Sequence, residues 1–232
     1  MINNEIDNIV SRYKRREIFM TNRYSILRPE IYLIEQEKER SLIKWINENN
    51  IAPVGNKKLL EIGCGTGNNI LTFLKLGFQP ENIFANELLE NRYTEAKKKL
   101  PQAIQIIPGN ALDIEFPNNE FDIVFQSMVF SSILDDQFKL ELAQKIFNLT
   151  KPGGGVLWYD FIYNNPKNRD VMGINFQEVK KLFPNSVMIK QKITLAPPLA
   201  RFVTRVHPKL YYVFNSFFFL RTHLLVWIKK ND

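Results

Sequence analysis

The sequence has 232 residues, of which 45% are hydrophobic and 24% charged, so it fits one soluble globular domain of ordinary size. Its single cysteine, Cys64, excludes an internal disulfide framework and zinc sites built from several thiolates, and no apolar run approaches the roughly 20 residues that span a bilayer. The net charge of +7 favours anionic partners such as nucleic acid, phosphorylated substrates or a lipid surface, although a solvated basic surface explains it equally well.

The N-terminal segment is expected to be helical. Residues 1–7 lack the basic start and apolar stretch of a signal peptide, so we expect a cytoplasmic protein. Residues 28–49 place apolar side chains at helical spacing among charges, with Pro29 near the start. A loop that contains Pro53 and Gly55 follows. We therefore assign residues 1–56 to an N-terminal helical cap.

From residue 58 onward, short apolar strands alternate with helical segments. Strands that alternate with helices through short turns predict a parallel sheet covered on both faces. The expected strands are residues 58–62, 82–86, 103–107, 121–126 and 155–160, and the expected helices are residues 68–76, 91–100 and 135–149.

After residue 160 the alternation changes. A short helix is expected at residues 177–183, followed by strands at 187–195 and 222–229. Between these two strands lies an insertion, residues 196–220, which is rich in aromatic side chains and punctuated by prolines. The chain thus divides into the cap (1–56), a core of alternating strands and helices (57–160) and C-terminal strands with the insertion (161–232), all within one structural domain.

The most informative segment runs from Leu59 to Gly67, where an apolar strand leads into three glycines at alternate positions and then into a helix. Glycine suits a sharp turn that a ligand must approach closely. The dinucleotide fingerprint G-x-G-x-x-G has a different spacing, built to hold a pyrophosphate at a helix N-terminus. Glu61, at the end of the strand, suits an ammonium group better than a pyrophosphate. Taken alone, the loop could also be a structural turn.

Polar residues follow the next two strands as well. Glu87 ends the second strand, where a carboxylate accepts hydrogen bonds from both hydroxyls of a ribose. After the third strand, Asn110 offers a side-chain acceptor for an adenine amino group, and the Ala111 N–H can reach a ring nitrogen. The arrival of these groups at three successive strand ends favours a nucleoside site over a structural turn.

These residues identify the resemblance. The chain resembles the class I S-adenosylmethionine-dependent methyltransferases, especially the small-molecule branch with the quinone-biosynthesis enzymes, and within it an uncharacterised bacterial subgroup. The similarity runs from about Lys57 to Asp160 and includes residues 116–124, which lead into the fourth strand, and the Pro-Gly-Gly-Gly turn at 152–155. It implies an α/β, Rossmann-like, seven-stranded and mostly parallel sheet with helices on both faces. The motifs are specific for class and cofactor, not for substrate.

The resemblance also implies the cofactor, S-adenosyl-L-methionine, and nine residues around it. Glu61 lies near the amino group through water or backbone, Glu87 holds the ribose, and Gln126 lines the floor near the sulfonium. The remaining residues shape the methionine and ribose pocket (Gly63, Gly65, Gly67), contact the adenine (Asn110, Ala111) or pack on its ring (Leu88).

Methyl transfer from a sulfonium is an in-line displacement in which positioning and exclusion of water supply most of the rate. A general base matters only when the acceptor must lose a proton. Ligands of open α/β sheets bind beyond the carboxyl ends of the strands, so the candidates follow the fourth and fifth strands: Gln126, Ser127, Asp160, Tyr163 and Asn164.

Asp160 is the leading candidate for a base or substrate-orienting group, and Tyr163 is the second. Their alternatives are structural: a residue that closes the fifth strand, and a turn at residues 163–166. His207 could reach the pocket from the insertion, whereas His223 is more often structural. Neither histidine has neighbours at a metal-ligand spacing, so no metal is expected.

The acceptor is left open by the sequence. Residues 126–129 read Gln-Ser-Met-Val instead of the Pro-Pro-aromatic cluster of enzymes that methylate base amines, and there is no RNA-binding signature, so nucleic acid is disfavoured. The aromatic insertion favours a small or lipophilic acceptor, with membrane contact through Arg201, Arg205 and Lys209 left open. We expect residues 196–220 and the N-terminal helices to form a lid over the acceptor pocket; packing of the insertion on its own core and a dimer interface are the alternatives.

Three functions are compatible with these features. An active small-molecule methyltransferase comes first, and a cofactor-binding protein without turnover, acting as a partner subunit, comes second. A nicotinamide-dependent oxidoreductase is disfavoured by the glycine spacing. The oligomeric state is not predictable from the sequence.

Overall fold

The computed structural model describes residues 2–17, 24–166 and 168–231. Its helices are α1 (Ile2–Glu17), α2 (Pro29–Glu48), α3 (Asn68–Lys75), α4 (Glu90–Lys99), α5 (Asp136–Leu149), α6 (Phe176–Leu182), α7 (Pro197–Val206) and α8 (Leu210–Ser216). Its strands are β1 (Leu59–Ile62), β2 (Ile83–Glu87), β3 (Gln105–Pro108), β4 (Phe121–Ser127), β5 (Thr150–Phe161), β6 (Val187–Leu195) and β7 (Arg221–Lys229). Short 3-10 helices are η1 (Pro80–Asn82), η2 (Ala111–Asp113), η3 (Phe130–Ser132) and η4 (Phe218–Leu220).

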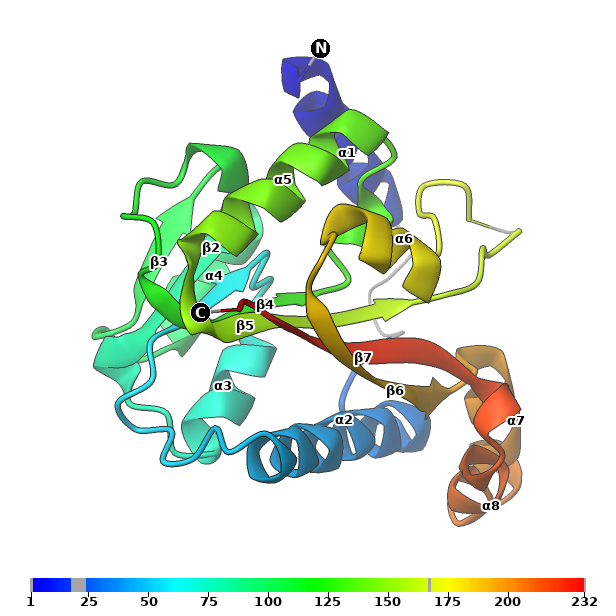
Figure 1. Cartoon of the computed structure of the whole chain (residues 1–232). Helices are drawn as coiled ribbons and strands as arrows, with labels where there is room; N and C mark the ends of the chain where they lie inside the picture. The colour runs from blue at the N-terminus through cyan, green and yellow to red at the C-terminus, as the bar shows by residue number, and fades with distance from the viewer. Residues whose placement is uncertain (1, 18–23, 167, 232) are drawn as a thin grey trace.

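All seven strands join one sheet in the order β3-β2-β1-β4-β5-β7-β6 (Figure 1). The first five pair in parallel, whereas β7 is antiparallel to both β5 and β6. The predicted fold class, a seven-stranded and mostly parallel Rossmann-like sheet with helices on both faces, is confirmed. We call the edge where β1, β2, β4 and β5 end the carboxyl edge.

Two hydrophobic clusters cover the two faces of the sheet. Leu59 and Leu60, consecutive in β1, are both fully buried and belong to different clusters, because successive side chains of a strand point to opposite faces. On one face α2, α3 and α4 contribute to the cluster, and on the other α5 and α6 do so (Figure 1). This double burial explains why the strands are continuous apolar runs in the sequence.

Strand β5 starts earlier than expected. The Pro-Gly-Gly-Gly run, expected as a turn, belongs to the strand. The Gly153 N–H donates a hydrogen bond to the Lys230 carbonyl, and the Lys230 N–H donates one to the Gly154 carbonyl. A Cβ on Gly155 would lie 2.7 Å from the Trp227 ring and 2.6 Å from the Ile228 carbonyl oxygen. Close packing of β7, not only a turn, therefore requires glycine here.

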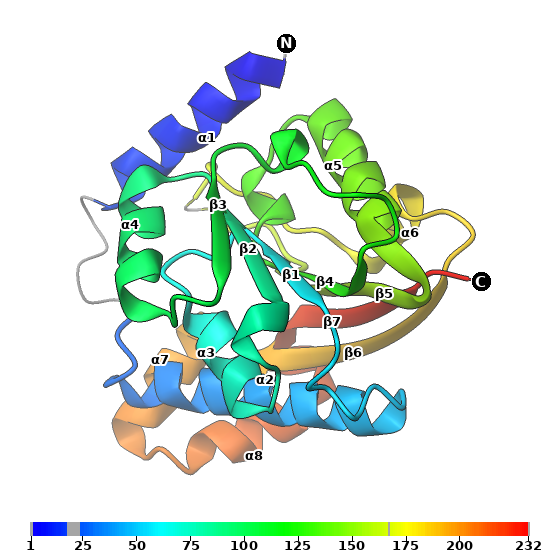
Figure 2. The same ribbon diagram turned by 90° about the vertical axis from the view of Figure 1, so that its left-hand side faces the viewer.

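Helix α1 lies across the carboxyl edge (Figure 2). The Arg12 guanidinium donates to the Ser132 carbonyl in η3 at 3.1 Å, and the Arg92 guanidinium of α4 lies over the Tyr13 ring at 4.5 Å. Since η3 follows β4 and α4 follows β2, α1 bridges the segments on both sides of the end of β1. Of the N-terminal helices, this one covers the edge.

The insertion, residues 196–220, packs elsewhere. Helices α7 and α8 contact α2 and β6, with Ala200, Val203 and Tyr211 buried against Leu33 and Leu195. Phe214 is half-buried against the same cluster, whereas five other aromatic side chains are exposed: Phe202, Tyr212, Phe217, Phe218 and Phe219. The expectation of an aromatic lid that lines a cavity toward Gly63 and Gln126 is therefore wrong, because the face that packs is short and mostly aliphatic while the aromatic face turns to solvent.

Candidate functional site

The glycine loop, residues 63–67, connects β1 to α3. All three glycines have positive φ: 65° at Gly63, 57° at Gly65 and 83° at Gly67. A Cβ on Gly63 would lie 2.6 Å from Val129 Cγ2, and one on Gly67 would lie 2.7 Å from Leu100 Cδ1. A Cβ on Gly65 would meet no atom of the described residues within 4 Å. Two glycines thus permit close packing, and the middle one leaves open space beside the loop.

Glu87 holds this loop from the neighbouring strand. Its Oε2 accepts a hydrogen bond from the Gly65 N–H at 2.7 Å, and its Oε1 accepts one from the Leu89 N–H at 2.9 Å. Burial raises the pKa of Glu87, while these backbone donors lower it by less. Each carboxylate oxygen has a second lone pair, so the group can still accept from a ligand hydroxyl.

Glu61 is the most unusual side chain of the edge. It is fully buried; its Oε1 accepts from Asn69 Nδ2 at 2.7 Å, and its Oε2 has no hydrogen-bond partner among the described residues. Burial raises its pKa to about 8, and the Lys38 ammonium lowers it by less. Because a buried carboxylate oxygen without a partner is costly, the position calls for a cationic or donor group from outside the described residues.

The end of β3 is arranged by two asparagines. Asn110 Oδ1 accepts from the Leu112 N–H at 3.1 Å and so caps η2, which begins with the half-buried Ala111. Asn86, which the sequence analysis missed, donates from Nδ2 to the carbonyls of Ile107 and Gly109 at 3.2 and 2.9 Å. A polar residue next to Glu87 inside a buried strand is the signal that could have revealed it.

Leu88 follows β2 directly and is half-buried. Its side chain packs against the cluster on the α5 side of the sheet, to which Ala111 also contributes. Leu88 and Ala111 therefore lie at neighbouring strand ends, as the predicted adenine site requires.

Gln126 is fully buried at the end of β4. Its Oε1 accepts from the Val129 N–H at 3.1 Å, and its Nε2 donates to the Tyr159 carbonyl at 3.5 Å. The amide spans the turn around Met128, whose φ is +64°. The structure thus brings Gln126 to the same edge as the glycine loop, with its amide engaged in shaping the turn.

Asp160 is also fully buried, on the opposite face of the sheet from Glu61. Its Oδ2 accepts from the Ser131 N–H at 3.1 Å and its Oδ1 from the Phe161 N–H at 3.0 Å, so it fixes η3. Burial raises the pKa of Asp160 to about 7, and these donors lower it by less. These hydrogen bonds support the structural alternative, in which Asp160 closes the fifth strand. A catalytic role for Asp160 stays a prediction.

Tyr163 does not join Asp160 in one pocket. Its side chain is 54% exposed, and its hydroxyl accepts from Lys192 Nζ at 3.1 Å. Asn164 Oδ1 accepts from the Gly173 N–H at 2.8 Å and shapes the local turn. Contact of Tyr163 with an acceptor stays a prediction.

A buried polar group on α2 escaped the sequence analysis. The Lys38 ammonium pairs with Glu35 Oε2 at 2.6 Å and lies over the Tyr159 ring at 5.6 Å. His223 stacks on the same ring with centroids 5.2 Å apart, and burial lowers its pKa to about 3, with a smaller contribution from Lys38. Sequence alone did not reveal the burial of Lys38, because charged residues at helical spacing usually form the solvated face of a helix.

Known proteins are similar to part of this chain in sequence. Residues 59–154 match the family model of the methyltransferase domain. An uncharacterised methyltransferase of Bacillus mycoides (strain KBAB4) is 31% identical over 119 residues, 50% of this chain and 54% of the relative, so the chain spans about half the length of the curated relatives it matches.

Solved structures extend the similarity of fold beyond that domain. An S-adenosylmethionine-dependent methyltransferase from Archaeoglobus fulgidus is 16% identical with a TM-score of 0.57, over 85% of this chain and 99% of that one. Phosphoethanolamine N-methyltransferase 2 of Haemonchus contortus, in complex with S-adenosyl-L-methionine, is 18% identical with a TM-score of 0.58, over 84% of this chain and 52% of that one. Residues 59–154 thus match a methyltransferase domain, and the fold of the chain is similar to that of S-adenosylmethionine-dependent methyltransferases.

Proposed function

We propose that the protein binds S-adenosylmethionine at the carboxyl edge and transfers its methyl group to a small or lipophilic acceptor. The observation that carries the proposal is the buried Oε2 of Glu61, which has no hydrogen-bond partner among the described residues. It lies at the start of a loop whose middle glycine, Gly65, borders open space. An ammonium group beside a glycine loop is the chemistry of the methionine part of this cofactor.

The other strand ends support the same ligand. Glu87 keeps lone pairs for the ribose hydroxyls beyond its two backbone donors. Leu88 and Ala111 offer apolar surface for the adenine at neighbouring strand ends, and Asn110 contributes its amide. Along the edge, the groups suited to an amino acid, a ribose and an adenine follow one another from β1 to β3. A nucleoside that carries an amino acid tail has its parts in the same order.

When bound, the cofactor supplies an electrophilic methyl group on a sulfonium. The residues of this chain align the acceptor and exclude water, which are the two requirements of an in-line displacement. Gln126 and Asp160 both hold the segment that follows β4, because they accept hydrogen bonds from the Val129 and Ser131 N–H groups. Helix α1, bonded to η3 through Arg12, shields the edge from solvent.

Asp160 is the candidate for proton transfer. Its pKa of about 7 allows the carboxyl group to accept or hold a proton near neutral pH. Only acceptors that lose a proton need such a group. Asp160→Asn should therefore reduce turnover of hydroxyl acceptors more than turnover of tertiary amines or thiolates.

A second candidate function has its own observation. Both oxygens of Asp160 accept backbone N–H groups, and Tyr163 lies at the surface, so neither predicted catalytic residue is presented freely to a pocket. A chain that binds the cofactor and acts as a partner subunit would fit this arrangement.

The test separates binding from turnover. Calorimetry should detect S-adenosylhomocysteine binding to the wild type and at least tenfold weaker binding to Glu61→Gln, because the amide cannot lose a proton to form the carboxylate that pairs with an ammonium group. Glu90→Gln, an exposed acid in the first turn of α4, is the matched control. Binding of NAD in place of the homocysteine nucleoside would overturn the cofactor assignment.

Turnover is read as release of S-adenosylhomocysteine during a screen of phenols, amines, thiols and long-chain acids. Release with any acceptor supports the leading proposal. Tight cofactor binding without release from any acceptor, alone or with candidate partner proteins, favours the second candidate.

A further inference from the structure

Helix α7 has two apolar faces, where a solvated helix has one. Its inward face carries Ala200, Val203 and Thr204, which are buried at the spacing of successive helical turns. Its outward face carries Phe202 and Val206, one turn apart and 67% and 68% exposed. A surface helix of a soluble protein normally places polar side chains there. The outward face of α7 is thus unpartnered apolar surface.

The exposed surface continues through the rest of the insertion. Tyr212 and Val213 of α8 are exposed, and so are Phe217, Phe218 and Phe219. The rings of Phe217 and Phe219 lie 5.8 Å apart, and those of Phe218 and Phe219 lie 6.0 Å apart. Scattered exposed hydrophobic side chains are ordinary, whereas a contiguous group marks an interaction site.

A groove extends this surface onto the chain before α2. It has a volume of about 470 Å³, and its lining includes Ile26, Leu27, Tyr32, Pro208 and Tyr212, with Lys209 among them. Leu27 is 89% exposed. Segments far apart in the sequence therefore form one apolar area with a cation at its side. We call the outward face of the insertion together with this groove the docking face.

The charged side chains of the insertion are all cationic. Residues 196–221 contain Arg201, Arg205, Lys209 and Arg221 and no aspartate or glutamate. Residues 179–231 contain ten Lys and Arg and no acid, whereas residues 1–178 contain 21 Lys and Arg and 23 acids.

The neighbouring acids of α2 do not offset this charge. Glu35 pairs with Lys38 at 2.6 Å, and Glu37 accepts from the Tyr211 hydroxyl and the Thr194 N–H at 2.6 and 3.0 Å. Both carboxylates are therefore directed to internal partners.

We propose that the docking face binds the surface of an anionic lipid bilayer. Exposed aromatic side chains flanked by arginine and lysine suit the boundary between headgroups and acyl chains, and the cations add attraction to anionic headgroups. Contact is peripheral, because within residues 2–17, 24–166 and 168–231 no helix is long and apolar enough to cross a membrane.

Docking would place the carboxyl edge near the lipid. The insertion leaves β6 at Leu195, and Leu195 pairs with Arg221 at the start of β7, two residues from the pairing of His223 with Phe161 at the end of β5. The inference stands whether or not the protein transfers methyl groups.

Flotation with vesicles tests it. Wild-type protein should bind vesicles of phosphatidylcholine with about 30% phosphatidylglycerol at least tenfold more strongly than pure phosphatidylcholine. Phe202→Ser/Phe218→Ser/Phe219→Ser should lose at least tenfold of that binding. Arg205→Ala/Lys209→Ala should lose about fivefold and depend less on salt.

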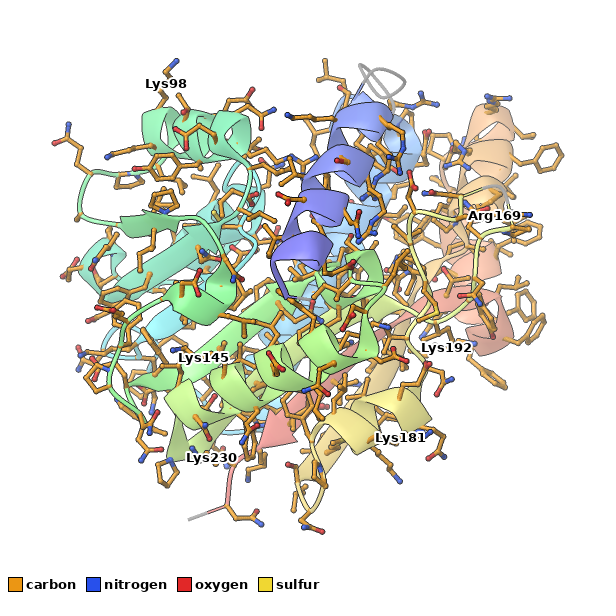
Figure 3. The ribbon with its side chains drawn as sticks, turned by 90° about the horizontal axis from the view of Figure 1, so that it is seen from above. Lys98, Lys145, Arg169, Lys181, Lys192 and Lys230 are labelled. Carbon is orange, nitrogen blue, oxygen red and sulfur yellow. The ribbon has the colours of Figure 1, made fainter. Side chains whose placement is uncertain are left out.

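Two control variants match these in chemistry. Leu71→Ser/Leu140→Ser/Val187→Ser removes exposed apolar side chains from α3, α5 and β6, and Lys98→Ala/Lys181→Ala removes two cations, labelled in Figure 3, from α4 and α6. Both should bind like the wild type, and circular dichroism checks that every variant is folded.

Three results would overturn the proposal: no flotation of the wild type, equal losses in the control variants, or a wild-type dimer in light scattering that the phenylalanine variant dissociates while vesicle binding is unchanged. The last result would assign the face to a second copy of the chain.

Discussion

The carboxyl edge and the insertion meet at the ends of β5, β6 and β7, yet they use their residues in opposite ways. At the edge, charged side chains are buried, as Glu61, Glu87 and Asp160 are, and most of their oxygens accept hydrogen bonds from the chain. In the insertion, aromatic side chains that could fill a core are exposed. The edge is therefore destabilised by desolvated charge and the insertion by hydrated apolar surface. Under the two proposals above, a bound ligand would offset the first cost and a lipid surface the second.

The largest expected effect that separates the two regions is a pH dependence. Because the pKa of Glu61 is raised from 4.5 to about 8, the folded state keeps a proton that the unfolded state loses in this window. The free energy of unfolding should fall as pH rises, by roughly 4 kcal/mol up to pH 8. Urea titrations across the window should show a flatter profile for Glu61→Gln, whereas Phe218→Ser should follow the wild type. Parallel profiles of wild type and Glu61→Gln would contradict the pKa shift.

The second largest effect is expected from added side-chain volume in the glycine loop. Gly63→Ala should lower the free energy of unfolding by about 3 kcal/mol, because its Cβ would meet Val129 and its φ is positive. Gly65→Ala shares the positive φ without the clash, so it should cost only about 1 kcal/mol of stability. The methyl group would nevertheless occupy the open space of the loop and weaken S-adenosylhomocysteine binding at least tenfold. Equal stability losses in the two variants would mean that packing does not distinguish these glycines.

Glu87→Ala sharpens the comparison at the ribose position. It should weaken cofactor binding by about 2 kcal/mol or more, since two hydroxyl donors lose a charged acceptor. Calorimetry on the folded variant measures the loss, with Glu90→Ala as the control. Unchanged affinity would remove Glu87 from the site.

The smallest stability effect is expected in the insertion. Phe218→Ser/Phe219→Ser should change the free energy of unfolding by no more than about 0.5 kcal/mol, because both side chains are already in water. Thermal or urea unfolding provides the measurement. A loss comparable to that of Gly63→Ala would mean that these rings pack in solution.

The sequence predicted those features that depend on residues close together in the chain. The strand alternation and the glycine spacing predicted the sheet and the position of the loop, because both depend on backbone conformations that few residues adopt. Prediction failed where two distant segments meet. The contacts of α1 with η3, the burial of Lys38 and the outward direction of Phe202 depend on which faces pack, and helical periodicity alone does not distinguish two apolar faces of one helix.

The single cysteine gives the loop a built-in reporter. Cys64 lies inside the glycine loop, its side chain is buried, and its Sγ lies 3.6 Å from the Gly65 carbonyl oxygen. Burial raises the pKa of the thiol, so alkylation in the native state should proceed only through brief openings of the loop. The rate of thiol modification therefore measures the opening equilibrium of this one segment, without a label or a mutation. Slowing of that rate by a bound nucleoside would report occupancy of the loop.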